Sequence, residues 1–337
     1  MIAYLDLLSK HRNSIMGFAM LWIMLFHIPK LSGFKPFDFI QATGYGGVDI
    51  FIFLSGFGLY FAMLKYEKNL KKYYKKRFLR IMPEFWFVLC IVYLFKMDYS
   101  IDSFCNLLSD ASSLKYWIGK PSPMWFVSFI LVFYAIFPFY FRLFKKHGMK
   151  VPVLFIGLGF VILCIYAFVA VHFYDNRIIG GLTIFSYARI PIFFIGSIFG
   201  YLANEECSFT LRKKDKKLSL LCFFIAILFL AYSLKFVQEY LCTFSLYFLP
   251  FVVIAPVLCV ILAICFEKFR NVDKLFAWIG TLSLELYMCH SYLYNFFYDI
   301  VGYFGVPRAC LLLFLLSVML AVILNRINKC CLQKIFI

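Results

Sequence analysis

The segment RNSIMGFAMLWIMLFHIPKLSGFKPFDFIQATGYGGVDIFIFLSGF, from Arg12 to Phe57, decides the class of fold. It holds two apolar runs, each about as long as a membrane-spanning helix, and the first contains His27. The second begins with a glycine pair followed closely by Asp49. Ionisable side chains are unfavourable in hydrocarbon and usually face a bundle interior or a wet cavity. We therefore interpret His27 and Asp49 as parts of a catalytic site.

The rest of the chain is as apolar as this segment. Of its 337 residues, 64% are hydrophobic and only 15% are charged, which is too few for the surface of a soluble domain. The apolar runs are much longer than the ~10 residues of a membrane β-strand, so we expect helices that satisfy their own backbone hydrogen bonds. No cleavable signal peptide is evident. The sequence predicts an all-α, polytopic membrane helical bundle.

Breaks at charged, proline and glycine residues divide the chain into ten expected spans. They cover residues 13–33, 45–64, 82–97, 124–143, 151–173, 183–203, 218–236, 244–266, 275–298 and 308–326. We expect no linker long enough to join a second domain, so residues 1–337 are predicted to form one integral membrane domain.

Lysine and arginine residues predict the orientation of the bundle. A cytoplasmic N-terminus places 25 of the 34 basic residues in cytoplasmic segments, so both termini are predicted to be cytoplasmic. The net charge of +17 then reflects retention and contact with anionic membrane lipid, and it requires no nucleic acid. We expect a multi-pass protein of the cell membrane.

One basic stretch is denser than retention requires. It runs from Lys65 to Pro83 and places Arg77 and Arg80 three residues apart, on one face of a helix near the membrane surface. The forked guanidinium groups suit phosphate binding. A lipid-facing basic collar is an equally good interpretation of the same residues.

Six motifs then occur in order along the chain. They are Leu25-Phe26-His27; Gly46 to Phe57; Lys76 to Pro83; Trp125-Phe126 with Tyr134 and Pro138; Arg189-Ile190-Pro191 with Gly196; and Gly280 to Ser283 with Tyr287 and His290. With these motifs the chain resembles the acyltransferase 3 family of integral membrane O-acyltransferases over most of its length.

The resemblance implies transfer of an acyl group, usually acetyl, from cytoplasmic acyl-CoA to a hydroxyl of a cell-surface glycan or similar acceptor, in the bacterial cytoplasmic membrane. It implies that Arg77 and Arg80 hold the nucleotide phosphates, and that His27 acts as general base. Arg189 is the candidate for stabilising the developing oxyanion. Acetyl-CoA, or another acyl-CoA, is the expected co-substrate.

The chain departs from the family at one position. The family commonly has an arginine 11 residues before the histidine, where this chain has Met16, and the nearest arginine is Arg12. Arg12 shares a helix face with His27 but lies about 22 Å away along the axis. It either serves the cytoplasmic portion of the donor or snorkels to the interface.

Other candidate residues have two interpretations each. Asp49 either pairs with His27 and fixes its tautomer, or caps the second helix. His290 and Glu285, both inside a span, are candidate acceptor or transition-state contacts, although His290 could equally be a core histidine. Trp125 either stacks on a sugar ring or anchors the helix at the interface. The cysteines show no metal-type spacing, so no metal is expected.

Two other functions compete with the enzyme. A transporter or flippase for a glycan or lipid-linked intermediate could use buried His, Asp and Arg residues as a proton relay, but the paired broken spans of many transporters are not evident. A catalytically inactive membrane sensor is the other alternative, which the substitution at Met16 leaves open.

Overall fold

The computed structural model describes residues 4–29, 33–95, 100–117, 124–173, 186–205, 221, 224–228, 249–294 and 297–332. The regular elements within these ranges are helices, which confirms the predicted all-α class. Five are long and apolar enough to cross a membrane: α4 (Gly46–Tyr66), α5 (Leu70–Phe95), α8 (Trp125–His147), α13 (Phe251–Lys268) and α17 (Val306–Ile327), whose apolar stretch continues to Cys330. The chain is therefore a polytopic helical membrane protein.

Further helices complete the described part. They are α1 (Tyr4–Lys10), α2 (Arg12–His27), α3 (Lys35–Ala42), α6 (Ile101–Ala111), α7 (Leu114–Trp117), α9 (Lys150–Phe173), α11 (Ile190–Asn204), α14 (Arg270–Thr281), α15 (Ser283–Leu293), α16 (Phe297–Phe304) and the π-helical turn η3 (Asn328–Leu332).

Several expected spans have different bounds in the structure. The expected span at 13–33 is shorter, because α2 ends at His27 after 16 residues, and it is not among the five helices long and apolar enough to cross a membrane. The expected helix at 275–298 is wrong as a single element, because the chain breaks at Leu282 between α14 and α15. The expected span at 82–97 begins much earlier, at Leu70, because no helix breaker separates the basic stretch from the apolar run and Pro83 is accommodated within α5. The expected span at 218–236 lies almost entirely outside the described residues.

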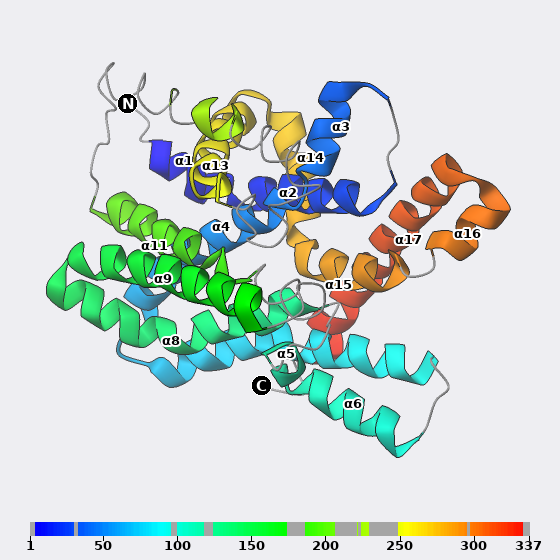
Figure 1. The fold of residues 1–337 in the computed structure, drawn as a ribbon, viewed down its shortest axis with the longest axis horizontal. Helices are drawn as coiled ribbons and strands as arrows, with labels where there is room; N and C mark the ends of the chain where they lie inside the picture. Colours follow the sequence, from blue (N-terminus) through cyan, green and yellow to red (C-terminus); the bar gives the residue numbers. More distant parts are fainter. Residues whose placement is uncertain are drawn as a thin grey trace.

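Helix α4 lies beside α11, and α8, α9 and α11 run next to one another (Figure 1). The close approach of α4 and α11 depends on two glycines. A Cβ atom on Gly56 would meet the Phe193 carbonyl oxygen, and one on Gly196 would meet the Phe53 carbonyl oxygen. Small residues at such crossings let helix backbones approach closely in a membrane.

Close contacts at glycine residues also join α2 to the C-terminal half of the chain. A Cβ atom on Gly17 of α2 would meet the Phe276 carbonyl oxygen of α14, and one on Gly280 would meet the Asn13 carbonyl oxygen. This contact brings the N-terminal and C-terminal parts of the chain together around α2.

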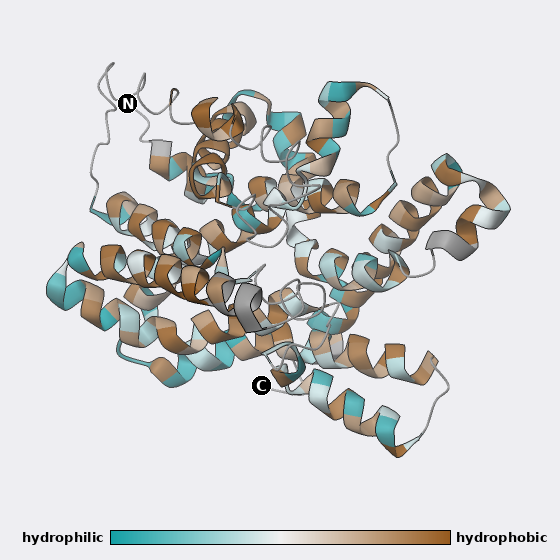
Figure 2. Cartoon of the chain, in the orientation of Figure 1, coloured by the Kyte–Doolittle hydropathy of each residue, from teal (hydrophilic) through white to brown (hydrophobic). Residues whose placement is uncertain are grey.

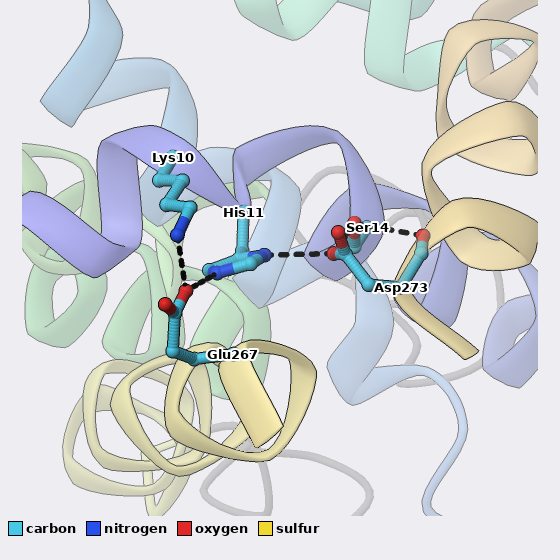
Figure 3. A network of polar contacts seen from close by, with 5 residues as sticks. All are labelled: Lys10, His11, Ser14, Glu267 and Asp273. Carbon is cyan, nitrogen blue, oxygen red and sulfur yellow. Dashed lines mark hydrogen bonds and ion pairs between the residues drawn. The ribbon is translucent and has the colours of Figure 1, made fainter. Parts of the chain in front are cut away.

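A polar network holds the beginning of α2 to α13 and α14, and we call it the N-terminal clasp (Figure 3). The His11 ring lies between two carboxylates, with Nδ1 2.7 Å from Asp273 Oδ1 and Nε2 2.7 Å from Glu267 Oε2. Ser14 donates to Asp273 Oδ1 at 2.5 Å, and Lys10 donates to Glu267 Oε2 at 2.5 Å. Carboxylates accept hydrogen bonds, so each ring nitrogen of His11 faces an acceptor.

The outward-facing surface of the helices is apolar. Large hydrophobic side chains such as Leu158 and Val161 of α9, and Leu311 and Leu315 of α17, are exposed. Figure 2 shows hydrophobic residues along these helices and hydrophilic residues at the turn between α8 and α9. This pattern is the one expected where helices face lipid.

Candidate active site

His27 is the last residue of α2, and the helix itself holds its ring. Nδ1 lies 2.8 Å from the carbonyl oxygen of Ile23, one turn earlier. A carbonyl oxygen only accepts, so Nδ1 carries the hydrogen, and the neutral ring presents its lone pair at Nε2. The ring is half-buried at the helix end. This tautomer is the one that a general base acting through Nε2 requires.

His290 of α15 repeats this arrangement. Its Nδ1 lies 2.9 Å from the Leu286 carbonyl oxygen, again one turn earlier, and its Nε2 is buried without a hydrogen-bond partner. The centroids of the His27 and His290 rings are 5.1 Å apart. The structure therefore brings together two histidines with the same orientation relative to their helices, and each leaves Nε2 available to a ligand.

The expected hydrogen bond between His27 and Asp49 is wrong. Asp49 instead accepts from Arg189 Nε at 3.2 Å, and both side chains are only 2% exposed. The alternative role, N-cap of the second helix, is also wrong, because α4 begins at Gly46 and Tyr45 occupies the cap position. The negative charge still lies in the first turn of α4, where the helix dipole favours it.

Arg189 lies just before α11, as its N-cap residue, and is held on several sides. Besides its bond to Asp49, it donates from Nη2 to the Tyr45 carbonyl oxygen at 3.2 Å. Its guanidinium carbon lies 5.4 Å from the centre of the Trp125 ring. Trp125, predicted as a sugar-stacking residue or an interfacial anchor, therefore forms a cation–π contact within the protein.

The two histidines line a cavity of about 420 Å³ between α2, α15 and α17. We call it the outer cavity, because the predicted topology places this end of α2 at the outer side. Apart from the histidines, Tyr294 and Ser317, its walls are apolar. The Ser317 hydroxyl donates to the Leu313 carbonyl oxygen of its own helix at 2.7 Å.

A second cavity, the inner cavity, lies further toward the N-terminal end of α2. On α2 it is lined by Met16, Met20 and Ile23, whereas the lining of the outer cavity continues to Ile28. On α15 its lining runs from Ser283 to Tyr287, and that of the outer cavity begins at His290. The two cavities therefore follow each other along the same two helices. His290 is the first α15 residue of the outer lining, whereas on α2 that lining begins at Leu21 and His27 lies near its far end.

Arg80 lines the inner cavity, and two further arginines gather near it. The positive charges of Arg77 and Arg80 both act on the buried Arg12 guanidinium. Arg12 donates to the Leu54 carbonyl oxygen at 3.2 Å and lies against Gly58, where a Cβ atom would leave it little room. The structure thus brings together the three arginines predicted for the donor, and none forms an ion pair with a carboxylate among the described residues.

Comparison with known proteins supplies the family. A family model described as an acyltransferase domain matches residues 15–326. The chain belongs to the acyltransferase 3 family. A search of curated proteins and a search of solved structures each found no match. Membership implies an acyltransferase activity at the membrane, and the matched region includes both histidines and the inner cavity.

Glu285, which was predicted to contact the acceptor or the transition state, lies outside the lining of both cavities. Glu285 of α15 accepts a hydrogen bond from Asn325 of α17 and lines neither the inner nor the outer cavity. It lies near Glu84 of α5, which accepts from Asn328. Glu285 therefore joins α15 to α5 and α17, and the expectation that it contacts acceptor or transition state is not supported by its place in the bundle.

Sequence reasoning missed the groups that orient the histidines. These groups are backbone carbonyls at Ile23 and Leu286, which no residue pattern reveals. It also missed Tyr294, whose ring centroid lies 5.9 Å from that of His27. Its spacing from His290 was a usable signal, because residues four apart share a helix face. Among the described residues, no group of three or more His, Cys, Asp or Glu side chains could hold a metal ion.

Proposed function

We propose that this acyltransferase moves an acyl group, acetyl in the simplest case, from cytoplasmic acyl-CoA to a hydroxyl group presented at the outer cavity. The observation that carries the proposal is His27 in the wall of the outer cavity, with Nδ1 fixed by Ile23 and no partner for Nε2 among the described residues. One substrate enters from each cavity and the two meet at this ring.

The inner cavity suits the donor. Its lining includes Arg80, and Arg12 and Arg77 add two further positive charges close by. Guanidinium groups without carboxylate partners are well suited to the phosphates of coenzyme A. The inner cavity has a volume of only about 60 Å³, so side chains along the Met16, Met20 and Ile23 face of α2 would have to move apart for the narrow pantetheine arm to follow it toward His27.

The chemical step requires a base for the acceptor hydroxyl. Nε2 of His27 takes the proton while the hydroxyl oxygen attacks the thioester carbonyl carbon. The tetrahedral intermediate then collapses, the carbon–sulfur bond breaks, and the imidazolium returns the proton to the sulfur of coenzyme A. The products are an ester and free coenzyme A. His290, with its own unpartnered Nε2, accepts a second hydrogen bond from the acceptor and positions it.

Arg189 has a different role in this scheme from the oxyanion contact predicted for it. It lines neither cavity, and Asp49, the Tyr45 carbonyl and Trp125 surround its guanidinium. We therefore assign it to holding the start of α4 against α8 and α11. A group that is held on several sides by the protein is poorly placed to bind a charge that develops elsewhere.

Transfer by the purified protein tests the proposal. The protein is reconstituted in lipid nanodiscs with radiolabelled acetyl-CoA, and release of free coenzyme A is measured with and without hydroxyl acceptors. We expect acceptor-dependent release that His27→Ala abolishes. Succinyl-CoA in parallel defines the acyl group, and mass analysis of cell-surface glycans with and without the protein identifies the natural acceptor. Uptake of a glycan without coenzyme A release would instead indicate a transporter.

A further inference from the structure

We propose that the acceptor is an amphiphile, whose head-group hydroxyls lie against His27 and His290 and whose hydrocarbon chain fills the outer cavity. This inference rests on the proposed function. It specifies the class of acceptor, which neither the family nor the sequence identifies.

The first argument is the chemistry of the cavity wall. A free sugar presents hydroxyl groups in every direction, and burying each of them without a partner is unfavourable. The outer cavity has few polar side chains, and one of them, Ser317, is already bonded to its own helix. The remaining wall includes Met24, Ile28, Leu293 and Leu313. Such a wall suits an alkyl chain, with the hydroxyl groups of the ligand confined to the region beside the histidines.

The second argument is the unpartnered nitrogen. His290 is 5% exposed, and its Nε2 has no hydrogen-bond partner, although buried polar atoms are normally satisfied. Nδ1 of this ring is turned toward the Leu286 carbonyl, so Nε2 is the ring nitrogen that stays without a partner among the described residues, and His290 is part of the cavity lining. The proton of the reacting hydroxyl is used by His27, so a second hydroxyl of the same head group supplies the donor for His290 Nε2. The polar end of the ligand is thereby fixed beside the two histidines.

The third argument is access. Leu311 and Phe314 line the outer cavity and are also 59% and 38% exposed on the outside of α17. Helix α17 is one of the five helices long and apolar enough to cross a membrane, so this side faces lipid. An amphiphile can therefore enter sideways from the bilayer. A chain carried by the donor would arrive through the inner cavity and would need no lateral opening.

Surrogate acceptors of graded chain length test the inference. Methyl, hexyl, octyl and decyl β-glucosides are offered with acetyl-CoA to the protein in nanodiscs, and acceptor kcat/KM is measured. We expect at least a tenfold rise from methyl to octyl glucoside, because each buried methylene group adds favourable transfer free energy. A kcat/KM that does not depend on chain length would overturn the inference.

Two tryptophan variants on α17 separate the cavity from simple partition into lipid. Leu313 is 6% exposed and lines the cavity, whereas Leu315 is 54% exposed and does not. We expect Leu313→Trp to lower the octyl-to-methyl ratio at least tenfold and to leave the KM for acetyl-CoA unchanged. Leu315→Trp should preserve the ratio. A ratio cannot be changed by loss of folded protein alone, so misfolding of Leu313→Trp does not imitate the effect.

Enlarging the cavity supplies an independent variant. Phe314→Ala should move the preferred acceptor from octyl toward decyl glucoside. If Leu313→Trp instead alters the preference between acetyl-CoA and octanoyl-CoA, with the glucoside series unaffected, the chain in the cavity belongs to the donor and the inference is wrong.

A binding measurement distinguishes this inference from the proposed function. An octyl glucoside carrying a diazirine at the end of its chain is photolysed with the protein, and labelled peptides are mapped. Labelling of the α17 segment around Leu313, competed by unlabelled octyl glucoside, supports the cavity assignment even if no acyl transfer is found. Absence of competed labelling there overturns it.

Discussion

His11 and His27 lie at opposite ends of the first long stretch of helix, and their surroundings differ completely. At His11 both ring nitrogens bind carboxylates, of Asp273 and Glu267, and the ring is 4% exposed. At His27 one nitrogen binds the carbonyl of Ile23, and the other faces a cavity. Both ring nitrogens of His11 are engaged by the protein, whereas Nε2 of His27 has no partner among the described residues and is left for a ligand.

The same distinction separates the other ionisable groups. Asp49 and Arg189 are paired with each other inside the bundle, like His11 with its carboxylates. Arg12, Arg77 and Arg80 lie near one another without an ion-pair partner among the described residues, like the two histidines at the outer cavity. We infer that the paired groups stabilise the bundle and that the unpaired groups bind substrates.

The most sensitive test of this distinction is His27→Ala. We expect turnover to fall by about 10²–10⁴, the usual contribution of a general base. Thermal stability in detergent should stay near that of the wild type, because the lost contact is one hydrogen bond within the last turn of α2. Both quantities must be measured on the same preparation. If activity falls only in proportion to the amount of folded protein, His27 is a packing residue. That result would contradict the inference that ionisable groups without a protein partner bind substrates.

The Asp49–Arg189 pair should show the opposite behaviour. Asp49→Ala leaves a buried, uncompensated guanidinium, and we expect a loss of stability of about 3–5 kcal/mol. Replacing both members, as Asp49→Leu with Arg189→Met, removes the charge with its partner and should recover most of that stability. Unfolding measurements on the single and double variants provide the comparison.

Activity of that double variant then tests the assignment of Arg189. If the pair is only structural, turnover per folded protein should also recover. Recovery of stability with turnover still reduced by about 10² or more would restore the oxyanion role for Arg189, since removal of one oxyanion donor has an effect of that size.

The N-terminal clasp should affect stability less and chemistry not at all. His11→Ala removes charge-assisted hydrogen bonds to Asp273 and Glu267, and we expect a loss of stability of about 2–3 kcal/mol with turnover per folded protein unchanged. Lys10→Ala is the matched control, because Lys10 makes an exposed ion pair with the same Glu267 and should contribute less than about 1 kcal/mol. A fall in turnover for His11→Ala that exceeds the loss of folded protein would show that the clasp also controls the site.

The sequence predicted the class of fold because hydrophobicity reports it directly, and it predicted the approximate bounds of α4, α8 and α17. It failed at Leu282, because the break between α14 and α15 lies within a continuous run of apolar and small residues. It named His27, His290 and the three arginines. It could not predict the partners of these groups, because partners depend on helix rotation and crossing. Asp49 was therefore assigned to His27, although the packing of α4 against α11 gives it to Arg189.

Substitution of Arg77 and Arg80 has the smallest expected effect. It tests directly whether arginines without a carboxylate partner bind the donor. Arg77→Ala with Arg80→Ala should raise the apparent KM for acetyl-CoA by about tenfold, since charge-assisted hydrogen bonds to phosphate are lost. The KM for the acceptor should not change, because the outer cavity is lined by none of these residues. Lysine at both positions should rescue only part of the donor affinity, since it lacks the bidentate fork.

Lys71→Ala with Lys72→Ala removes the same charge from exposed positions of α5 and is the matched control. Equal effects of the two double variants would mean that α5 attracts the donor by net charge alone, and the basic stretch would then be the lipid-facing collar.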